Sequence, residues 1–331
     1  MSWNLIDTLD APRSLAKAWD DKKANSTEIN LILVKLLMQS NFEAHPMIVC
    51  TRNHGVVDTN NFSIQDFNRT VACVAFEGRN IVLDATARFA DYPLLSSSIL
   101  NTNGLLISMD PIRWIPIKDT VGVYRNDVIL LGHLRGDTSF LTNGYVNSTG
   151  YSKAERVEKL DRDSLKGLRN DWFVRSDKKM QLKHFIVANE YVDSLPLAQE
   201  FDIQIPLEKS DNLFAVQPTK FTIPDTLLSI TETRKANINF GYRQHYTLVS
   251  EFSFPDNYDV YLMPNNVDMS IENGAISYTR EFHRTNHNFY QRINFSIDKT
   301  YFSGANIETV AKFFKRIATL SKQTVLLKKL Y

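Results

Sequence analysis

The chain has 331 residues, of which 43% are hydrophobic and 11% aromatic. This composition excludes a disordered protein, and at about 100–200 residues per domain the length predicts two or three domains. The 38 basic and 37 acidic residues leave a formal charge of +1, without the basic excess of a dedicated nucleic-acid-binding protein, and no apolar run reaches the roughly 18 residues of a membrane span.

The first predicted elements are helices. Residues 11–40 follow helical spacing, with a break at residues 22–25. The run Ile29–Met38 is apolar on most sides, and the few polar side chains around it fall within one narrow stripe. This pattern predicts a helix that the fold nearly encloses, with Ser26 and Asn30 on its inward side.

Short β-like runs follow the helices, at His45–Arg52, Arg69–Phe76 and Asn80–Ala85. Residues 77–79 predict a hairpin turn between the last two runs. The proline, serines, asparagines and glycine of residues 91–108 predict a loop.

Most of the remaining chain alternates apolar and polar residues in the manner of antiparallel strands. A helical stretch at Ser152–Arg175 interrupts the pattern, residues 206–225 indicate a connector, and Asn306–Ser321 has the spacing of a terminal helix. We expect the strands at Trp114–Ile117, Val121–Tyr124, Val128–Leu134, Ser139–Val146, Lys183–Val192, Phe201–Pro206, His245–Phe254, Tyr258–Met263, Ala275–His283, Phe289–Ile297 and Thr324–Lys328. The predicted class is therefore α+β: a buried helix on an antiparallel sheet, followed by mostly antiparallel β structure and a C-terminal helix.

Two stretches of the N-terminal part carry a resemblance. The runs KKANSTEINLILVKLLMQSNFEAHPMIVCTRNHG and FNRTVACVAFEGRNIVLDATARF resemble the second half of a transglutaminase-like core, over residues 20–90. More narrowly, the chain is similar to bacterial cell-envelope proteins in which such a core lies between two β domains. The later runs FSFPDNYDVYLMP and TVAKFFKRIATLSKQTVLLKK resemble the domain that follows the core, over residues 235–331.

This resemblance implies a division of the chain into three parts. They are a transglutaminase-like core remnant at 1–105, a β-rich middle domain at 106–225, and a C-terminal β domain with its terminal helix at 226–331. The first part of the core and the β domain before it would be missing, because only about 25 residues precede Ser26. The resemblance also implies a periplasmic or cell-surface location, although the N-terminus lacks the basic start and apolar stretch of a signal peptide.

The resemblance also implies where a catalytic triad would lie. The nucleophilic cysteine of the family falls on Ser26, the basic histidine on Arg69 and the orienting aspartate on Asp84. A thiol at a helix start is activated by backbone N–H groups and by an adjacent imidazole that accepts its proton. A hydroxyl at position 26 needs a base, and the guanidinium of Arg69 stays protonated below about pH 12, so we expect a degenerate site without catalytic residues.

Each of these positions also has a simple structural interpretation. Ser26 is a good N-cap for the helix that follows it. Arg69 and Asp84 lie on facing strands of the predicted hairpin, on one face and diagonal to one another, which favours an ion pair.

The function we expect is a non-catalytic scaffold that binds a protein or a glycan at the cell envelope. One alternative is a serine-dependent acyl transferase or amidase that uses Ser26 with a base elsewhere in the chain. Another is a structural subunit that assembles with copies of itself, which a large apolar surface would favour.

Other kinds of site have little support in the sequence. The chain has no glycine-rich phosphate loop, so we expect no cofactor. His283 and His287 are at helical spacing, but they belong to a strand-and-turn segment without a nearby acidic ligand, so we expect no metal. Cys50 and Cys73 lie in neighbouring strand-like runs; two buried free thiols are expected, with a cross-strand disulfide as the alternative.

Overall fold

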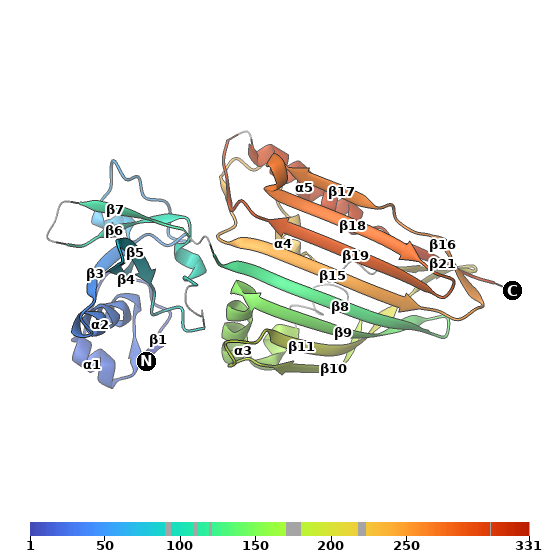
Figure 1. The fold of residues 1–331 in the computed structure, drawn as a ribbon, viewed down its shortest axis with the longest axis horizontal. Coiled ribbons are helices and arrows are strands. Elements are labelled where there is room, and N and C mark those ends of the chain that lie inside the picture. Colours follow the sequence, from blue (N-terminus) through green and yellow to red (C-terminus); the bar gives the residue numbers. More distant parts are fainter. Residues whose placement is uncertain are drawn as a thin grey trace. The chain divides into compact units, whose positions relative to one another are not determined.

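The structure is a computed structural model that describes residues 1–89, 94–108, 112–118, 121–169, 180–217, 223–304 and 306–330. The chain divides into two compact units, Met1–Gly122 and Val123–Tyr331 (Figure 1). Helices and mostly antiparallel sheets are present in both units, which confirms the predicted α+β class. None of the helices in these ranges is both long and apolar enough to cross a membrane.

The first unit is built on a five-stranded antiparallel sheet in the order β5-β4-β3-β6-β7. Helix α2 packs against β3 and β4 of this sheet. The strands are β3 (Glu43–Val49), β4 (Arg69–Phe76), β5 (Arg79–Leu83), β6 (Thr102–Leu106) and β7 (Arg113–Ile117), and the helices are α1 (Leu15–Asp20) and α2 (Ser26–Gln39). A short parallel pair, β1 (Ser2–Trp3) and β2 (Lys23–Ala24), and two 3₁₀ turns, Ile64–Asp66 and Ser97–Ile99, complete the unit.

The predicted break in the first helical region and the predicted hairpin are both confirmed. Helix α1 ends at Asp20 and α2 begins at Ser26. Strands β4 and β5 are joined by Glu77 and Gly78, both at positive φ (47° and 73°). Positive φ at both central residues is the geometry of a two-residue turn that matches the twist of the strands.

The second unit is built on an eight-stranded sheet in the order β10-β11-β9-β8-β15-β19-β18-β17. All neighbours in this sheet are antiparallel except β8 and β15, which run parallel. Its strands are β8 (Val123–Arg135), β9 (Ser139–Gly150), β10 (Gln181–Ala188), β11 (Leu197–Pro206), β15 (Arg243–Ser253), β17 (Val267–Ile271), β18 (Ile276–Arg284) and β19 (Asn288–Ile297).

One face of the eight-stranded sheet carries the core of this unit. Its inward side chains pack against α5 and against a four-stranded sheet in the order β12-β13-β21-β16. Figure 1 shows the eight-stranded sheet in front, with α4 and α5 behind it. The remaining elements are β12 (Glu208–Ser210), β13 (Leu213–Val216), β14 (Ile238–Asn239), β16 (Tyr258–Leu262), β20 (Tyr301–Phe302), β21 (Val325–Lys329), the 3₁₀ turn Glu272–Gly274, α3 (Tyr151–Arg169), α4 (Asp225–Leu228) and α5 (Asn306–Leu320).

The two compact units differ from the division predicted at 105/106 and 225/226. The sheet of the first unit includes β7, which lies beyond residue 105. The boundary at 225/226 would divide a single sheet, because β8 pairs with β15 along eleven residues, from Arg243 opposite Val123 to Ser253 opposite His133. A parallel pairing between strands so far apart in the sequence leaves no local signal.

Four local predictions need correction. Helix α2 is not nearly enclosed by the fold: in its second half Leu36 and Met38 are 44% and 58% exposed. The loop predicted at 91–108, whose residues 91–93 lie outside the described ranges, contains strand β6. The glycine inside this strand, Gly104, has a steric reason, because a Cβ at this position would lie 2.5 Å from the sulfur of Met47. The predicted runs at 121–124 and 128–134 form one strand, β8, and the predicted connector at 206–225 contains β12 and β13. Helix α3 ends at Arg169, and positions 170–175 of the predicted helix lie outside the described residues.

Candidate functional site

All three positions named from the resemblance lie in the first unit, where Arg69 and Asp84 contact one another directly and Ser26 is linked to Asp84 only through Asn30. Ser26 is the first residue of α2, Arg69 is the first residue of β4, and Asp84 directly follows β5. Nη1 of Arg69 lies 3.0 Å from Oδ2 of Asp84, so the predicted ion pair is confirmed. The side chains of Arg69 and Asp84 are 2% and 0% exposed, which makes this a buried pair.

The guanidinium of Arg69 is fully engaged by its neighbours. Nε and Nη2 donate to the two carboxylate oxygens of Asp7, at 2.7 and 2.8 Å. Nη1 donates to Asp84 and also to hydroxyls, of which Ser98 is the nearest at 2.8 Å, and the indole ring of Trp3 lies 5.0 Å away. The bidentate contact with Asp7 and the further contact with Asp84 hold the guanidinium of Arg69 in one position.

These contacts determine the protonation of Arg69. Burial by itself lowers the pKa of the guanidinium, but the hydrogen bonds to Asp7 and the charges of Asp84 and Asp7 outweigh burial and raise the pKa. An arginine whose pKa is raised cannot accept a proton at any physiological pH. Position 69 therefore holds a permanent cation.

Asp84 is tied to the helix as well as to Arg69. Its Oδ1 accepts hydrogen bonds from Nδ2 of Asn30 at 3.0 Å and from the hydroxyl of Thr86 at 2.7 Å. Asn30 also donates to the backbone oxygen of Ser26 and accepts from the backbone N–H of Ala85. Asn30, which the sequence placed on the inward side of α2, thus links the start of this helix to the end of β5.

Ser26 itself is 0% exposed, and its predicted role as N-cap is wrong. Asn25 is the N-cap: its side chain accepts from the backbone N–H of Glu28, and the Glu28 carboxylate accepts from the backbone N–H of Asn25. This reciprocal pair satisfies two backbone donors at the helix start and leaves no capping role for Ser26.

An N-terminal segment lies over the start of α2. The backbone N–H of Ser26 donates to the oxygen of Ile6 at 3.0 Å, and the Ser26 hydroxyl accepts from the N–H of Thr8 at 3.3 Å. The hydroxyl of Thr27 donates to the oxygen of Thr8 at 2.6 Å. An acyl substrate has no access to the Ser26 hydroxyl while this segment is in place.

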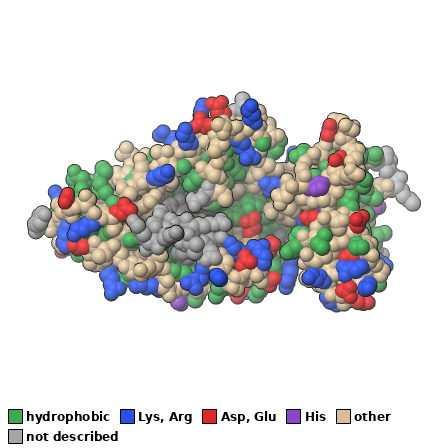
Figure 2. Space-filling model, turned by 180° about the vertical axis from the view of Figure 1, so that it is seen from behind, with side chains coloured by type: hydrophobic (Ala, Val, Ile, Leu, Met, Phe, Trp, Pro, Cys, Tyr) green, Lys and Arg blue, Asp and Glu red, His purple; other side chains and the backbone are tan. Residues whose placement is uncertain are grey.

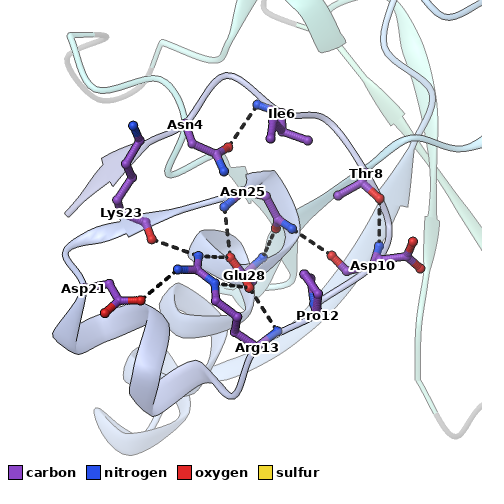
Figure 3. A pocket seen from close by; sticks show the side chains of 10 residues that line it. All are labelled: Asn4, Ile6, Thr8, Asp10, Pro12, Arg13, Asp21, Lys23, Asn25 and Glu28. Carbon is purple, nitrogen blue, oxygen red and sulfur yellow. Dashed lines mark hydrogen bonds and ion pairs between the residues drawn. The ribbon is translucent and has the colours of Figure 1, made fainter.

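A shallow cavity of about 600 Å³ lies beside the covered helix start (Figure 3). It is lined by Asn4, Ile6, Thr8, Asp10, Pro12, Arg13, Asp21, Lys23, Asn25 and Glu28. The guanidinium of Arg13 occupies its charged side, where it donates to Glu28 at 3.0 Å, to Asp21 at 3.0 Å and to the backbone oxygen of Lys23 at 2.9 Å. The hydrogen bond from Arg13 lowers the pKa of the buried Glu28 carboxyl, against burial that raises it. Arg13, Glu28 and Asp21 therefore satisfy one another, whereas Asp10 and Lys23 line the same cavity with charged side chains.

The other candidate groups of the sequence give no second site. Cys50 and Cys73 are both buried and free, as expected. Across the described ranges, no three His, Cys, Asp or Glu side chains are grouped closely enough to hold a metal ion. His287 lies 3.1 Å from Asp256, in a turn after the strand that holds His283.

Sequence reasoning missed several residues of this network. The spacing of Asn25 and Glu28 has the pattern of a capping box, so a local signal for both was present. No local sequence pattern indicated Asp7, because the residue that it contacts, Arg69, is 62 positions away in the chain. The same holds for Ser98, which is 29 positions away.

Comparison with known proteins adds a family match in the second unit. Residues 211–327 match the family model DUF3858, a domain of unknown function with a solved structure. This match covers β13 to β21 and does not extend over residues 20–90. No curated protein matches the chain.

One solved structure shares the fold of the chain. It is a crystal structure described as a "putative protease" from Parabacteroides distasonis, with a TM-score of 0.51 and 9% sequence identity. The similarity covers 98% of this chain and 49% of the other, so the chain spans about half the length of that protein. At this identity the likeness concerns the fold alone.

Proposed function

We propose that the first unit is a degenerate transglutaminase-like core, and that the protein is a non-catalytic scaffold which binds a protein or a glycan at the cell envelope. The observation that carries this proposal is the environment of Arg69. It is a buried cation, held by Asp7 and Asp84, where a proton acceptor would have to be.

The meeting of three distant positions supports the transglutaminase-like part of the proposal. Ser26, Arg69 and Asp84 were chosen from the resemblance, and they lie at the start of a helix and at the ends of the neighbouring strands, linked through Asn30. The same geometry supports a loss of activity, because the Ser26 hydroxyl is covered and, among the described residues, no His, Asp or Glu side chain is hydrogen-bonded to it. The cell-envelope location and the partner class rest on the resemblance.

The enzymatic alternative can be tested directly. We expect no turnover of glutamine amides, peptide bonds or activated esters above background, and no covalent labelling by a fluorophosphonate probe. Ser26→Ala is the matched control, because it removes only the hydroxyl. Turnover or labelling that disappears in Ser26→Ala would replace the scaffold with a serine-dependent acyl transferase or amidase.

The binding part needs a separate measurement. We expect the intact chain to sediment with purified bacterial peptidoglycan, with cellulose as the unrelated glycan, or to crosslink to an envelope protein on intact cells. If neither occurs, and the protein is found in the cytoplasm of its native cell, the proposed envelope function is wrong.

A further inference from the structure

In the described part of the second unit, no element covers the outward face of the eight-stranded sheet, and its outward side chains are partly or fully exposed. We call the outward side chains of β10, β11, β9, β8, β15, β19 and β18 the open face. Its centre is apolar: Ile129 and Leu131 of β8 are 41% and 44% exposed, and Tyr145 of β9 is 38% exposed. Ile186 of β10 is 45% exposed, and Val249 of β15 is partly exposed. Exposed apolar side chains gathered on one flat surface are typical of a protein interface.

One row of the open face places opposite charges at equal distances from β8. The pairing registers put Glu200, Tyr145, Ile129, Val249 and Arg292 side by side across β11, β9, β8, β15 and β19. At about 4.8 Å between strands, Glu200 and Arg292 each lie about 10 Å from Ile129, on opposite sides. Within the described part of the chain, neither of them forms an ion pair, although the register places Glu281 opposite Arg292.

We propose that the open face binds the open face of a second copy of this chain, around a two-fold axis that runs approximately along β8. Such an axis places Glu200 of one copy opposite Arg292 of the other, twice, and places the apolar positions of β9 opposite those of β15. A two-fold interface requires a surface that is complementary to itself, and this row of five side chains has that property.

The neighbouring rows are compatible with the same axis. In the next outward row, Asp202 and Asn143 lie on one side of Leu131, and Glu251 and Tyr290 lie on the other. The axis brings Leu131 onto its own copy, Asn143 onto Glu251 and Asp202 onto Tyr290. Within each chain these carboxylates already accept hydrogen bonds, Asp202 from Asn143 at 2.6 Å and Glu251 from the Tyr290 hydroxyl at 3.2 Å, so this row adds no unpaired charge. Asp127, which lies on the axis in the row on the other side of Ile129, is neutralised by Arg125 at 2.8 Å.

The size of the face is sufficient for a stable dimer. Seven strands at about 4.8 Å and seven residues at about 3.3 Å give a surface of about 30 by 25 Å, or roughly 750 Å². Stable interfaces bury about 800 Å² on each partner. Figure 2 shows the other side of the molecule, where hydrophobic, acidic and basic side chains are all present.

The first experiment measures the mass of the full chain in solution by sedimentation equilibrium over a hundredfold range of concentration. We expect a dimer, and a dissociation constant that rises at least about tenfold in Leu131→Glu, which places two carboxylates at the apolar centre. Leu262→Glu is the matched control: Leu262 is 55% exposed on β16, outside the open face, so this variant should dimerise like the natural chain. Thermal unfolding of both variants confirms that they fold.

A charge exchange tests the axis itself. Glu200→Arg and Arg292→Glu should each weaken self-association, because each creates two like-charge contacts. Mixed together, the two variants should form a one-to-one heterodimer, because both contacts then join opposite charges. The double variant should dimerise with itself.

Three results would overturn the proposal. They are a natural chain that remains monomeric, a dimer that Leu131→Glu leaves intact, and a mixture of the two charge variants that does not associate. If the chain is monomeric while Leu131→Glu abolishes capture of an envelope protein or of peptidoglycan, the open face has another occupant. Failure here leaves the non-catalytic function untouched, because that function is tested at Ser26.

Discussion

The buried ion pair of the first unit makes a quantitative prediction about stability. In Arg69→Met the stem of the side chain is retained and the charge is removed. Asp84, which is 0% exposed, and Asp7, which is 25% exposed, are then left without their cation. Stranding a buried charge costs about 3–5 kcal/mol, so we expect the free energy of unfolding of the first unit to fall by this amount.

The reverse change should cost less. In Asp84→Asn an oxygen remains to accept from Asn30 and Thr86, and Arg69 keeps its forked contact with Asp7. We expect a loss of about 1–3 kcal/mol. The double variant should lose about 1–3 kcal/mol less than the sum of the two single losses, because no lone charge remains at position 84. Recovery stays partial, since the carboxylate of Asp7 has still lost its partner.

Urea unfolding, followed by tryptophan fluorescence and circular dichroism, measures these differences. The two units require a fit with two transitions, and Trp3, Trp19 and Trp114 report on the first one. Asp21→Asn is the control in the same unit: Asp21 also accepts from an arginine at 3.0 Å but is 44% exposed, so its loss should cost about 0–1 kcal/mol.

The reasoning is refuted if the two single losses simply add. Additivity within about 0.5 kcal/mol would mean that Arg69 and Asp84 do not interact. It is also refuted if Asp84→Asn costs no more than Asp21→Asn, because burial would then have no part in the strength of the pair.

Three further predictions concern other buried groups. The folded-state pKa of Glu28 is lowered, so the contribution of its carboxylate to stability is present above about pH 4.5 and is lost as the pH falls below this value. We therefore expect the free energy of unfolding to decline less between pH 7 and pH 3 in Glu28→Gln than in the natural chain. Burial raises the pKa of the Cys50 and Cys73 thiols, so neither should react with a thiol reagent at pH 8 in the folded chain. Both should react once urea unfolds the first unit, and rapid labelling of the folded chain would contradict this prediction. Gly144→Ala should destabilise the second unit by about 1–3 kcal/mol, because the new Cβ would lie 2.0 Å from the ring of Phe201. Adding Phe201→Leu to the same chain should recover part of this loss, as measured by thermal unfolding.

Local sequence patterns determined most of the elements. Strand β4 has the predicted bounds Arg69–Phe76, and α5 differs from its prediction by one residue. Alternation with a period of two and apolar spacing near 3.6 are properties of the chain itself, so they can be recognised without knowledge of what packs on each face. The Arg69–Asp84 ion pair could also be predicted from local sequence, because the two-residue turn of the hairpin fixes which residues of its two strands lie opposite one another.

The arrangement of these elements depends on contacts between distant segments, for which the sequence has no local pattern. The pairing of β8 with β15 joins two parts that sequence reasoning assigned to separate domains. The close contact of Met47 explains why a glycine, which indicated a loop in the sequence, lies inside a strand at position 104. The second carboxylate on Arg69, Asp7, comes from the covering N-terminal segment. The periodicity of apolar residues indicates which face of a helix or strand is buried. Which other helix or strand packs on that face is decided only by contacts between segments that are distant in the sequence. For that reason the residue types at positions 26, 69 and 84 could be read from the chain, whereas their covered and hydrogen-bonded arrangement could be seen only in the folded structure.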